Sequence, residues 1–314
     1  MLLGGTGTAG RATAMALRAA GHEVVAVTRT ASRGALPPGI HARVADVTSA
    51  ASLSEEAFRG ERFDALVSCL TSRTGVPGDA WAVDYGAHMA ALSAAELAGV
   101  PHMVLLSAIC VQKPRLAFQH AKLAFEDKLI ASGLAHSIVR PTAFFKSLSG
   151  QIERVRQGKP FLVFGDGRLT ACAPISDADL GAYMAGCLTD PSRRNQILPI
   201  GGPGPAITPL DQAEALFGLL DKPMRVRHVP VALLDGIVGL SALLGRLSPV
   251  WADRAERARI GRFYATESML ALDPATGRYD RDATPATGSD TLFEFYEKVL
   301  RGDARVDLGE HAVF

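Results

Sequence analysis

The 314-residue chain has the composition of an ordinary globular protein, with 48% hydrophobic and 21% charged residues. Its formal net charge is +1, so no strong overall field would attract nucleic acid, and we expect no nucleic-acid binding. The length allows one sizeable α/β domain with a smaller attached lobe, because single hydrophobic cores stop growing at about this size.

The four cysteines are scattered along the chain, at Cys69, Cys110, Cys172 and Cys187. They form no C-x-x-C pair and no histidine stands at zinc-finger spacing, so the sequence predicts neither a metal site nor an iron–sulfur cluster. We expect buried thiols, which are typical of a reducing compartment. The N-terminus has no basic segment followed by an apolar run, so we expect a cytoplasmic protein without an export signal.

Short apolar runs alternate with helical stretches from residue 1 to 140, which is typical of repeated βαβ units. The runs are rich in Val, Leu and Ile, as strands buried on both faces of a parallel sheet should be: Met1–Leu3, Glu23–Thr28, Ala42–Val44, Asp64–Ser68, His102–Leu106 and His136–Val139. Helices are expected over Arg11–Ala20, Asp79–Leu97 and Phe118–Ser132, each followed by a glycine. The fold class is therefore α/β, with a doubly wound parallel Rossmann sheet.

The first predicted strand has only three residues, Met1–Leu3, before a glycine-rich turn. Buried strands usually contain about five or six residues. Either this strand is short, or the sequence starts late and omits part of the strand.

Beyond Pro141 the alternation breaks into short elements punctuated by Gly and Pro. We expect residues 1–140 to form the Rossmann domain and residues 141–314 a smaller C-terminal lobe, partly interleaved with the Rossmann core. Ser176 and Thr208 are typical N-caps for helices over Asp177–Leu188 and Pro209–Leu220.

The run Val231–Leu247 is strongly apolar but contains Asp235. It is shorter than the roughly 20 residues that a bilayer crossing needs, so the sequence favours a buried or surface-docking helix. We expect at most peripheral association with a membrane.

Gly4, Gly7 and Gly10 follow the first strand and open the first helix, in the string LLGGTGTAG. This G-x-x-G-x-x-G spacing, with Thr6 inside the turn, resembles that of short-chain dehydrogenases. The glycines allow a tight turn, let a pyrophosphate approach backbone N–H groups at the helix N-terminus, and let the helix pack closely on the strand. The motif predicts a nicotinamide dinucleotide site.

Arg29 and Arg33 follow the second strand, where an NAD-dependent enzyme presents an Asp or Glu to the adenosine ribose. Two guanidinium groups would instead pair with a 2′-phosphate, so the sequence favours NADPH. Asp46, after the third strand, is placed to bond the adenine amino group. Cys69 and Leu70, after the fourth strand, would lie along the ribose.

Short-chain dehydrogenases that act on alcohols or ketones carry Y-x-x-x-K after the fifth strand, with the tyrosine as acid. This chain has Phe118 and Lys122 at those positions. Phenylalanine cannot protonate a carbonyl oxygen, so a ketone or alcohol substrate is disfavoured, whereas Lys122 can still hold the nicotinamide ribose. Ser107 ends the fifth strand, where the superfamily serine stands. Lys122 and Ser107 are therefore the catalytic candidates, and His120 and Cys110 remain alternative proton sources.

Four strings are more specific than the glycine motif: LLSAICVQKP (Leu105–Pro114), SIVRPTAFFKSLSGQ (Ser137–Gln151), VFGDGRL (Val163–Leu169) and IGRFYATESML (Ile260–Leu270). With shorter matches along nearly the whole chain, they resemble the NADPH-dependent divinyl chlorophyllide 8-vinyl reductases, an atypical branch of the short-chain dehydrogenase/reductase superfamily. The resemblance implies reduction of the C8 vinyl group of divinyl chlorophyllide a, or divinyl protochlorophyllide, to ethyl in chlorophyll or bacteriochlorophyll biosynthesis. It also implies a photosynthetic source.

The missing tyrosine agrees with this chemistry. A vinyl group conjugated to a tetrapyrrole can take hydride at its outer carbon while the macrocycle delocalises the charge, so no oxyanion needs an acid beside it. A large flat pigment with a carboxylate requires apolar walls and a cation. The wall candidates are Phe144, Phe145, Phe161, Phe164, Phe263 and Tyr264, and the carboxylate partners are Lys146, Arg168 and Arg262.

Two other functions are compatible with the residues. One is a different small-molecule reductase on the same atypical fold, with Lys122 as general acid or base. The other is a non-catalytic regulator that senses NADP, since Phe118 alone would suit that role. The family-specific strings argue against both.

Overall fold

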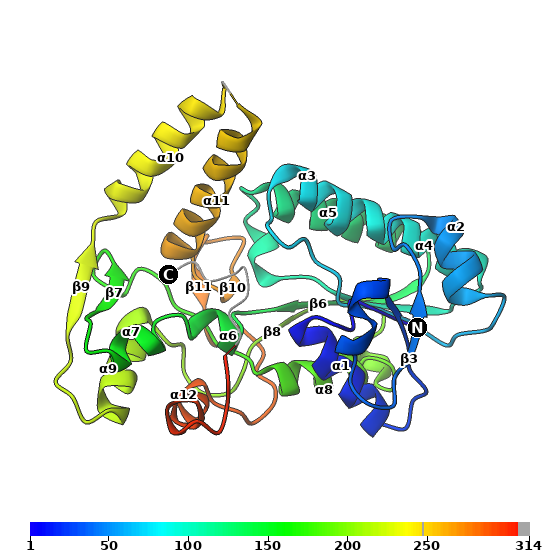
Figure 1. The fold of residues 1–314 in the computed structure, drawn as a ribbon, viewed down its shortest axis with the longest axis horizontal. Helices are drawn as coiled ribbons and strands as arrows, with labels where there is room; N and C mark the ends of the chain where they lie inside the picture. Colours follow the sequence, from blue (N-terminus) through cyan, green and yellow to red (C-terminus); the bar gives the residue numbers. More distant parts are fainter. Residues whose placement is uncertain (247, 307–314) are drawn as a thin grey trace. The chain divides into compact units, whose positions relative to one another are not determined.

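The computed structural model describes residues 1–246 and 248–306, apart from the side chains of Ala31 and Arg33. The chain forms two compact units (Figure 1). The first unit contains Met1–Arg73, Pro77–Pro141 and Asp177–Pro199, and the second contains Thr74–Val76, Thr142–Ser176 and the chain from Ile200 onward.

The first unit is built on a seven-stranded sheet within the described residues, in the order β3-β2-β1-β4-β5-β6-β8. Strands β1 to β6 pair in parallel, which confirms the predicted doubly wound Rossmann sheet. The strands are β1 (Leu2–Leu3), β2 (Val25–Thr28), β3 (His41–Val44), β4 (Leu66–Ser68), β5 (His102–Leu106), β6 (Ala135–Pro141) and β8 (Gln196–Ile200).

Helices cover both faces of this sheet (Figure 1), with α1 and α8 together on one face and α2, α4 and α5 on the other. The α-helices are α1 (Thr8–Ala19), α2 (Ala50–Ser52), α3 (Pro77–Ala80), α4 (His88–Leu97), α5 (Ala117–Ala131) and α8 (Asp177–Gly186). Two π-helical segments, Leu53–Phe58 and Trp81–Ala87, continue α2 and α3, and 3-10 turns occupy Thr30–Ala35, Ile109–Gln112 and Pro191–Arg193.

The expected helix over Asp79–Leu97 is thus a continuous run of α3, a π-helical segment and α4. A π turn changes the angular position of the residues that follow, which a search for a 3.6-residue period does not detect. Asp177–Pro199 returns to the first unit, where α8 packs on α1. A Cβ on Gly181 would lie 2.6 Å from the carbonyl carbon of Ala12, so only glycine permits this close approach.

The second unit combines short strand pairs with helices. Strands β7 (Phe161–Phe164) and β9 (Val226–Val229) pair in parallel, and β10 (Ala271–Leu272) and β11 (Tyr279–Asp280) pair antiparallel. The helices are α6 (Phe145–Leu148), α7 (Ile152–Arg156), α9 (Pro209–Leu219), α10 (Val231–Gly245), α11 (Pro249–Thr266) and α12 (Leu292–Arg301).

Helix caps and a buried tyrosine organise the second unit. The Thr208 hydroxyl accepts a hydrogen bond from the Asp211 backbone N–H at 3.3 Å, which confirms the predicted N-cap of α9. Tyr296 of α12 is fully buried, and its hydroxyl donates to the Leu148 carbonyl at 2.7 Å. Around it lies an apolar core that includes Phe161 and Leu216.

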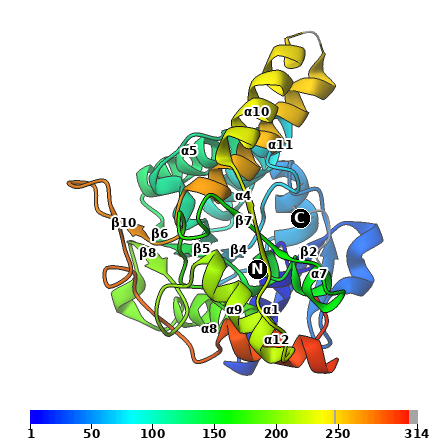
Figure 2. The same cartoon turned by 90° about the vertical axis from the view of Figure 1, so that its left-hand side faces the viewer.

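Helix α10 corresponds to the predicted apolar run, and its described residues end at Gly245, before Leu247, which lies outside the described residues. It packs along α11 (Figure 2). Among the described residues, none of the helices combines the length and apolarity that a membrane crossing requires.

Candidate active site

The glycine turn between β1 and α1 has the geometry that a dinucleotide requires. Gly4 has φ +74°, and a Cβ there would lie 2.6 Å from the Cys69 carbonyl carbon. A Cβ on Gly10 would lie 2.0 Å from the Gly4 carbonyl oxygen, so these two glycines close the turn against the sheet. Gly7 stands before the helix, and a Cβ there would make only an ordinary 3.5 Å contact with the protein.

The first turn of α1 therefore remains approachable by a ligand. Gly7 is the N-cap and provides no side-chain hydrogen bond to the helix amides, and no acidic residue lies in the first turn. Thr6 is half-buried within the turn. Backbone N–H groups at a helix N-terminus bind phosphate through their hydrogen bonds and the helix dipole. The turn thus fits the pyrophosphate of a nicotinamide dinucleotide.

The adenosine-side candidates lie after β2 and β3. Arg29 is exposed at the end of β2, beside Thr28, whose hydroxyl is buried without a hydrogen-bond partner among the described residues. The Arg33 side chain lies outside the described residues. Asp46 is exposed, and its Oδ1 accepts hydrogen bonds from the Thr48 N–H at 2.9 Å and the Thr48 hydroxyl at 2.7 Å, which orient the carboxylate.

Cys69 and Leu70 follow β4 and form one side of the glycine turn. The Cys69 N–H donates to the Leu3 carbonyl at 2.9 Å, which ties this loop to β1. Burial raises the pKa of the Cys69 thiol to about 11, so it stays protonated and is not a nucleophile at neutral pH. Cys69 therefore has a packing role beside the glycine turn rather than a chemical one.

Lys122, the lysine of the altered Y-x-x-x-K pattern, forms a buried ion pair that the sequence did not reveal. Its Nζ lies 2.9 Å from Oδ1 of Asp84, and the two side chains are 8% and 0% exposed. Oδ1 of Asp84 also accepts from the Thr71 hydroxyl at 3.2 Å and the Ser72 N–H at 3.3 Å. Asp84 Oδ2 is buried and has no hydrogen-bond partner among the described residues.

The electrostatics of this pair favour a charged Asp84 carboxylate. Burial alone would raise the pKa of the Asp84 carboxyl, but the Lys122 ammonium and the hydrogen bond from Ser72 outweigh it and hold that pKa below its ordinary value. His88, four residues after Asp84 at the start of α4, remains neutral, because burial and the nearby Lys122 ammonium lower its pKa to about 4. Its Nε2 lies 2.9 Å from the Ser68 hydroxyl.

A second buried carboxylate holds Ser107. The Ser107 hydroxyl donates to Glu126 Oε1 at 2.5 Å, and Glu126 is ion-paired with Arg140 of β6. Glu126 lies one turn beyond Lys122 on α5, so both candidate catalytic residues are held by this face of the helix. Asp84, His88, Leu105, Leu106, Ser107, Lys122 and Phe125 line one small pocket in the first unit.

The other proton-source candidates differ in accessibility. His120 is exposed on α5, as expected of a surface residue, whereas Cys110 is buried. Phe118 is also buried, where the superfamily tyrosine would stand. Among the described residues, no group of three or more His, Cys, Asp or Glu side chains gathers in an arrangement that could hold a metal ion.

The predicted pigment-binding residues of the second unit differ in burial and in pairing. Phe145, Phe161 and Phe263 are buried, so packing already accounts for them. Arg262 is ion-paired with Asp235. The remaining candidates are the partly buried Phe144, Phe164 and Lys146 and the exposed Tyr264 and Arg168.

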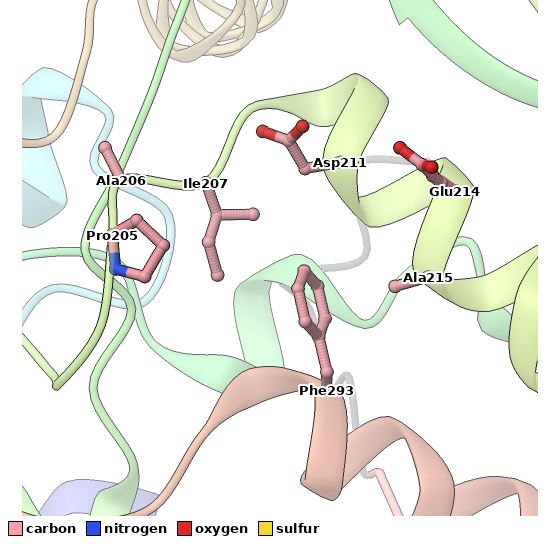
Figure 3. Close-up of a pocket in the computed structure, with 7 residues that line it drawn as sticks. All are labelled: Pro205, Ala206, Ile207, Asp211, Glu214, Ala215 and Phe293. Atoms are coloured by element: carbon pink, nitrogen blue, oxygen red, sulfur yellow. The ribbon is translucent and has the colours of Figure 1, made fainter.

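A pocket of about 390 Å³ also lies in the second unit (Figure 3). Its walls contain Ile207 and Phe293, but two carboxylates, Asp211 and Glu214, stand at its edge. Two acidic groups would repel a carboxylate-bearing ligand. This pocket is therefore a poor match for the predicted pigment.

Comparisons with known proteins agree with the geometry. A family model described as NAD(P)H-binding matches residues 4–191. The chain is 48% identical to the divinyl chlorophyllide a 8-vinyl-reductase, chloroplastic, of Oryza sativa subsp. indica, covering 100% of this chain and 82% of that protein. It is 44% identical to the Arabidopsis thaliana protein of the same name, covering 99% and 79%.

The chain belongs to the divinyl chlorophyllide a 8-vinyl-reductase family. It is an NAD(P)H-dependent reductase, and the predicted nicotinamide cofactor is confirmed at this level. Among solved structures, an NADPH-dependent quinone oxidoreductase of Escherichia coli has a TM-score of 0.70 at 20% identity, covering 95% of this chain and 99% of that one. This likeness shows a shared fold.

In this member of the vinyl-reductase family, the residues missed by sequence reasoning are the carboxylates Asp84 and Glu126 and their partners. Glu126 had a detectable signal, because it stands four residues after Lys122 on a predicted helix. Asp84 had a weaker one, as an acidic residue in an otherwise apolar, alanine-rich helix. Neither pattern predicts which residue each carboxylate contacts.

Proposed function

We propose that this chain reduces the C8 vinyl group of a divinyl chlorophyllide-type tetrapyrrole to ethyl, with NADPH as the reductant. The observation that carries this proposal is the full-length similarity to proteins named for that activity. The site agrees, because Phe118 cannot supply the acid that a ketone reduction requires while Lys122 is retained.

The cofactor, when bound, supplies a hydride to the outer vinyl carbon, and a proton must reach the inner carbon to complete the ethyl group. Lys122 binds and orients the cofactor. An ammonium has three N–H donors, so pairing with Asp84 leaves donors for ribose hydroxyls. Asp84 acts as a positioning residue, because it fixes the ammonium and balances its charge in a buried site.

Ser107 is poised differently. Its single hydroxyl proton is already donated to Glu126, so Ser107 is suited to accept a hydrogen bond rather than to give a proton. The buried Glu126–Arg140 pair fixes that orientation. Between the two catalytic candidates, Lys122 is the better proton source, and Ser107 the better acceptor for a cofactor or substrate donor.

NADPH is preferred over NADH in this proposal. Arg29 is an exposed cation at the end of β2, and no acid stands beside it to accept ribose hydroxyls. Arg33, four residues on, adds a second cation in the sequence. Asp46 would bond the adenine, and Cys69 and Leu70 would pack along the ribose. The Rossmann part would thus bind the cofactor, and residues 141–314 would supply most of the substrate lobe.

The proposal extends to bacteriochlorophyll as well as chlorophyll synthesis and to a cytoplasmic location beside photosynthetic membranes. The four buried cysteine thiols suit a reducing compartment. The curated relatives, in contrast, are named as chloroplastic.

The proposed activity can be tested by mixing the purified protein with NADPH and divinyl chlorophyllide. The Soret band should move to shorter wavelength as the conjugated vinyl becomes ethyl. With NADPH deuterated on the transferred face, one deuterium should appear on the outer carbon of the new ethyl group. A product that carries only solvent-derived hydrogen would rule out direct hydride transfer, and an unchanged spectrum would rule out the substrate.

A further inference from the structure

Helix α10 exposes an apolar stripe on one side. Leu233, Ile237, Leu240 and Leu243 are 56%, 45%, 61% and 58% exposed. Their spacing of three and four residues places them along one helix face, and we call these four residues the α10 stripe. Soluble proteins seldom expose a continuous row of large aliphatic side chains unless it contacts something.

The one charged residue of α10, Asp235, lies on a different face of the helix from this stripe. Asp235 is the one charged residue between Val231 and Gly245, all of which are described. Its Oδ1 is ion-paired with Nε of Arg262 on α11, so the acid is neutralised within the hairpin. Ser241, the one residue of α10 that is buried, also lies off the stripe. The stripe itself is therefore apolar and uncharged along the helix.

The turn end of the hairpin carries groups of a different kind. Val250 and Trp251, at the start of α11, are 61% and 36% exposed. The Arg254 guanidinium lies over the Trp251 ring, 4.6 Å from its centroid. Arg246 and Arg254 are exposed as well. Tryptophan and arginine, each with an apolar body and a polar end, are the side chains that sit at a membrane–water interface.

We propose that the α10–α11 hairpin docks on the surface of a lipid bilayer with anionic headgroups. The α10 stripe would enter the boundary between headgroups and acyl chains, with Arg246 and Arg254 against the phosphates. A second copy of this chain fits less well. A two-fold interface through the same stripe would offer the exposed arginines no anionic partner, because the stripe carries no charged residue.

This inference can be tested by co-sedimentation of the full chain with vesicles of phosphatidylcholine alone or mixed with phosphatidylglycerol. We expect clear binding to the mixed vesicles and much weaker binding to the neutral ones. The variant Leu240→Asn/Leu243→Asn should lose most of the binding. Arg246→Gln/Arg254→Gln should weaken binding to mixed vesicles roughly thirtyfold, since each of the two surface cations contributes about 1 kcal/mol.

Leu97→Asn is the matched control, because Leu97 is an exposed leucine outside the hairpin, at 79%. It should bind vesicles like the parent chain. In a Trp81→Phe background, Trp251 is the sole tryptophan, and its emission should shift to shorter wavelength on binding. All variants should keep the parent melting temperature, because the replaced side chains are exposed.

Equal binding by the parent and the Leu240→Asn/Leu243→Asn variant would overturn the proposal. So would a parent chain that ignores both vesicle types. A parent that is dimeric by light scattering, and becomes monomeric in that variant without vesicle binding, would assign the stripe to a second copy instead. None of these outcomes depends on the reductase activity, so they are separate from a failure of the proposed function.

Discussion

Lys122 and Asp84 form a buried ion pair in which Nζ lies 2.9 Å from Oδ1. The pair joins α5 to the π-helical segment Trp81–Ala87, and π turns within helices are frequent at functional sites. Breaking such a pair costs more than the pair contributes, because the remaining charge stays buried without a partner. This asymmetry makes Asp84 the sharpest test of the proposed site.

Asp84→Asn keeps the side-chain shape but leaves the buried Lys122 ammonium without its counter-charge, so that Lys122 is no longer held in place. We expect this variant to bind NADPH roughly tenfold or more weakly than the parent chain, as measured by fluorescence titration. An unchanged NADPH affinity in a variant that keeps the parent fold by circular dichroism would contradict the positioning role of Asp84.

Two variants control this experiment. Asp127→Asn removes an exposed carboxylate from α5 and should leave the NADPH affinity unchanged. Lys122→Met should weaken cofactor binding, and adding Asp84→Asn to it should cause little further loss. Fully additive effects would show that the two residues act independently.

Cofactor choice rests on Arg29. Charge-assisted hydrogen bonds contribute about 1.5–3 kcal/mol each, so Arg29→Ala should raise the KM for NADPH roughly tenfold or more and leave use of NADH nearly unchanged. Steady-state kinetics with both cofactors measure this. Arg62→Ala, an exposed arginine of the same unit, is the control and should change neither KM. Equal use of NADPH and NADH by the parent chain would contradict the proposed 2′-phosphate contact.

Restoring the superfamily tyrosine should not help. Phe118→Tyr adds an acid that vinyl reduction does not use, so kcat should stay the same or fall, whereas Lys122→Ala should lose most of the activity. Turnover of the tetrapyrrole by each variant provides the comparison. A several-fold rise in the kcat of Phe118→Tyr, or full activity in Lys122→Ala, would show that vinyl reduction does use an acid at position 118 or does not need Lys122.

Two glycines of the turn should have different roles, Gly10 in the stability of the fold and Gly7 in cofactor binding. Gly10→Ala would place a Cβ 2.0 Å from the Gly4 carbonyl oxygen, so the melting temperature of the cofactor-free protein should fall. Gly7→Ala makes only a 3.5 Å contact and should melt like the parent, yet bind NADPH more weakly, because its methyl group stands where the pyrophosphate approaches. If both variants melted alike and bound alike, the two glycines would not have separate roles.

Acid should destabilise the fold through His88. Burial lowers the pKa of His88 to about 4, against 6.5 for the free side chain, so the unfolded chain binds a proton first as the pH falls. The stabilisation is complete above pH 6.5 and is lost on acidification toward pH 4. The free energy of unfolding should drop by about 2 kcal/mol between about pH 7 and pH 5 from this residue alone.

Urea unfolding at several pH values measures that drop. His120→Gln, at an exposed histidine, should leave the pH dependence intact, whereas His88→Gln should reduce it even though it also lowers stability at neutral pH. An unchanged pH dependence in His88→Gln would assign the acid sensitivity to other groups.

The sequence by itself determined the features that depend on neighbouring residues. Gly4 needs a positive φ and Gly10 needs a close backbone contact, so the spacing of the glycines predicts the turn. Strands buried on both faces must be continuous apolar runs, which made β2, β4 and β5 predictable. The presence of phenylalanine instead of tyrosine at position 118 is likewise a fact of sequence, and it already disfavoured ordinary ketone chemistry.

Only the tertiary structure decided which distant groups meet. Periodicity indicates that a segment is helical but not the rotation of its faces, and the π-helical turn at Trp81–Ala87 rotates Asp84 toward Lys122. Arg140 reaches Glu126 because α5 packs on β6. Arg262 neutralises Asp235 because α11 packs back along α10. In each case the role of a charged side chain depends on an ion-pair partner that lies far away in the sequence.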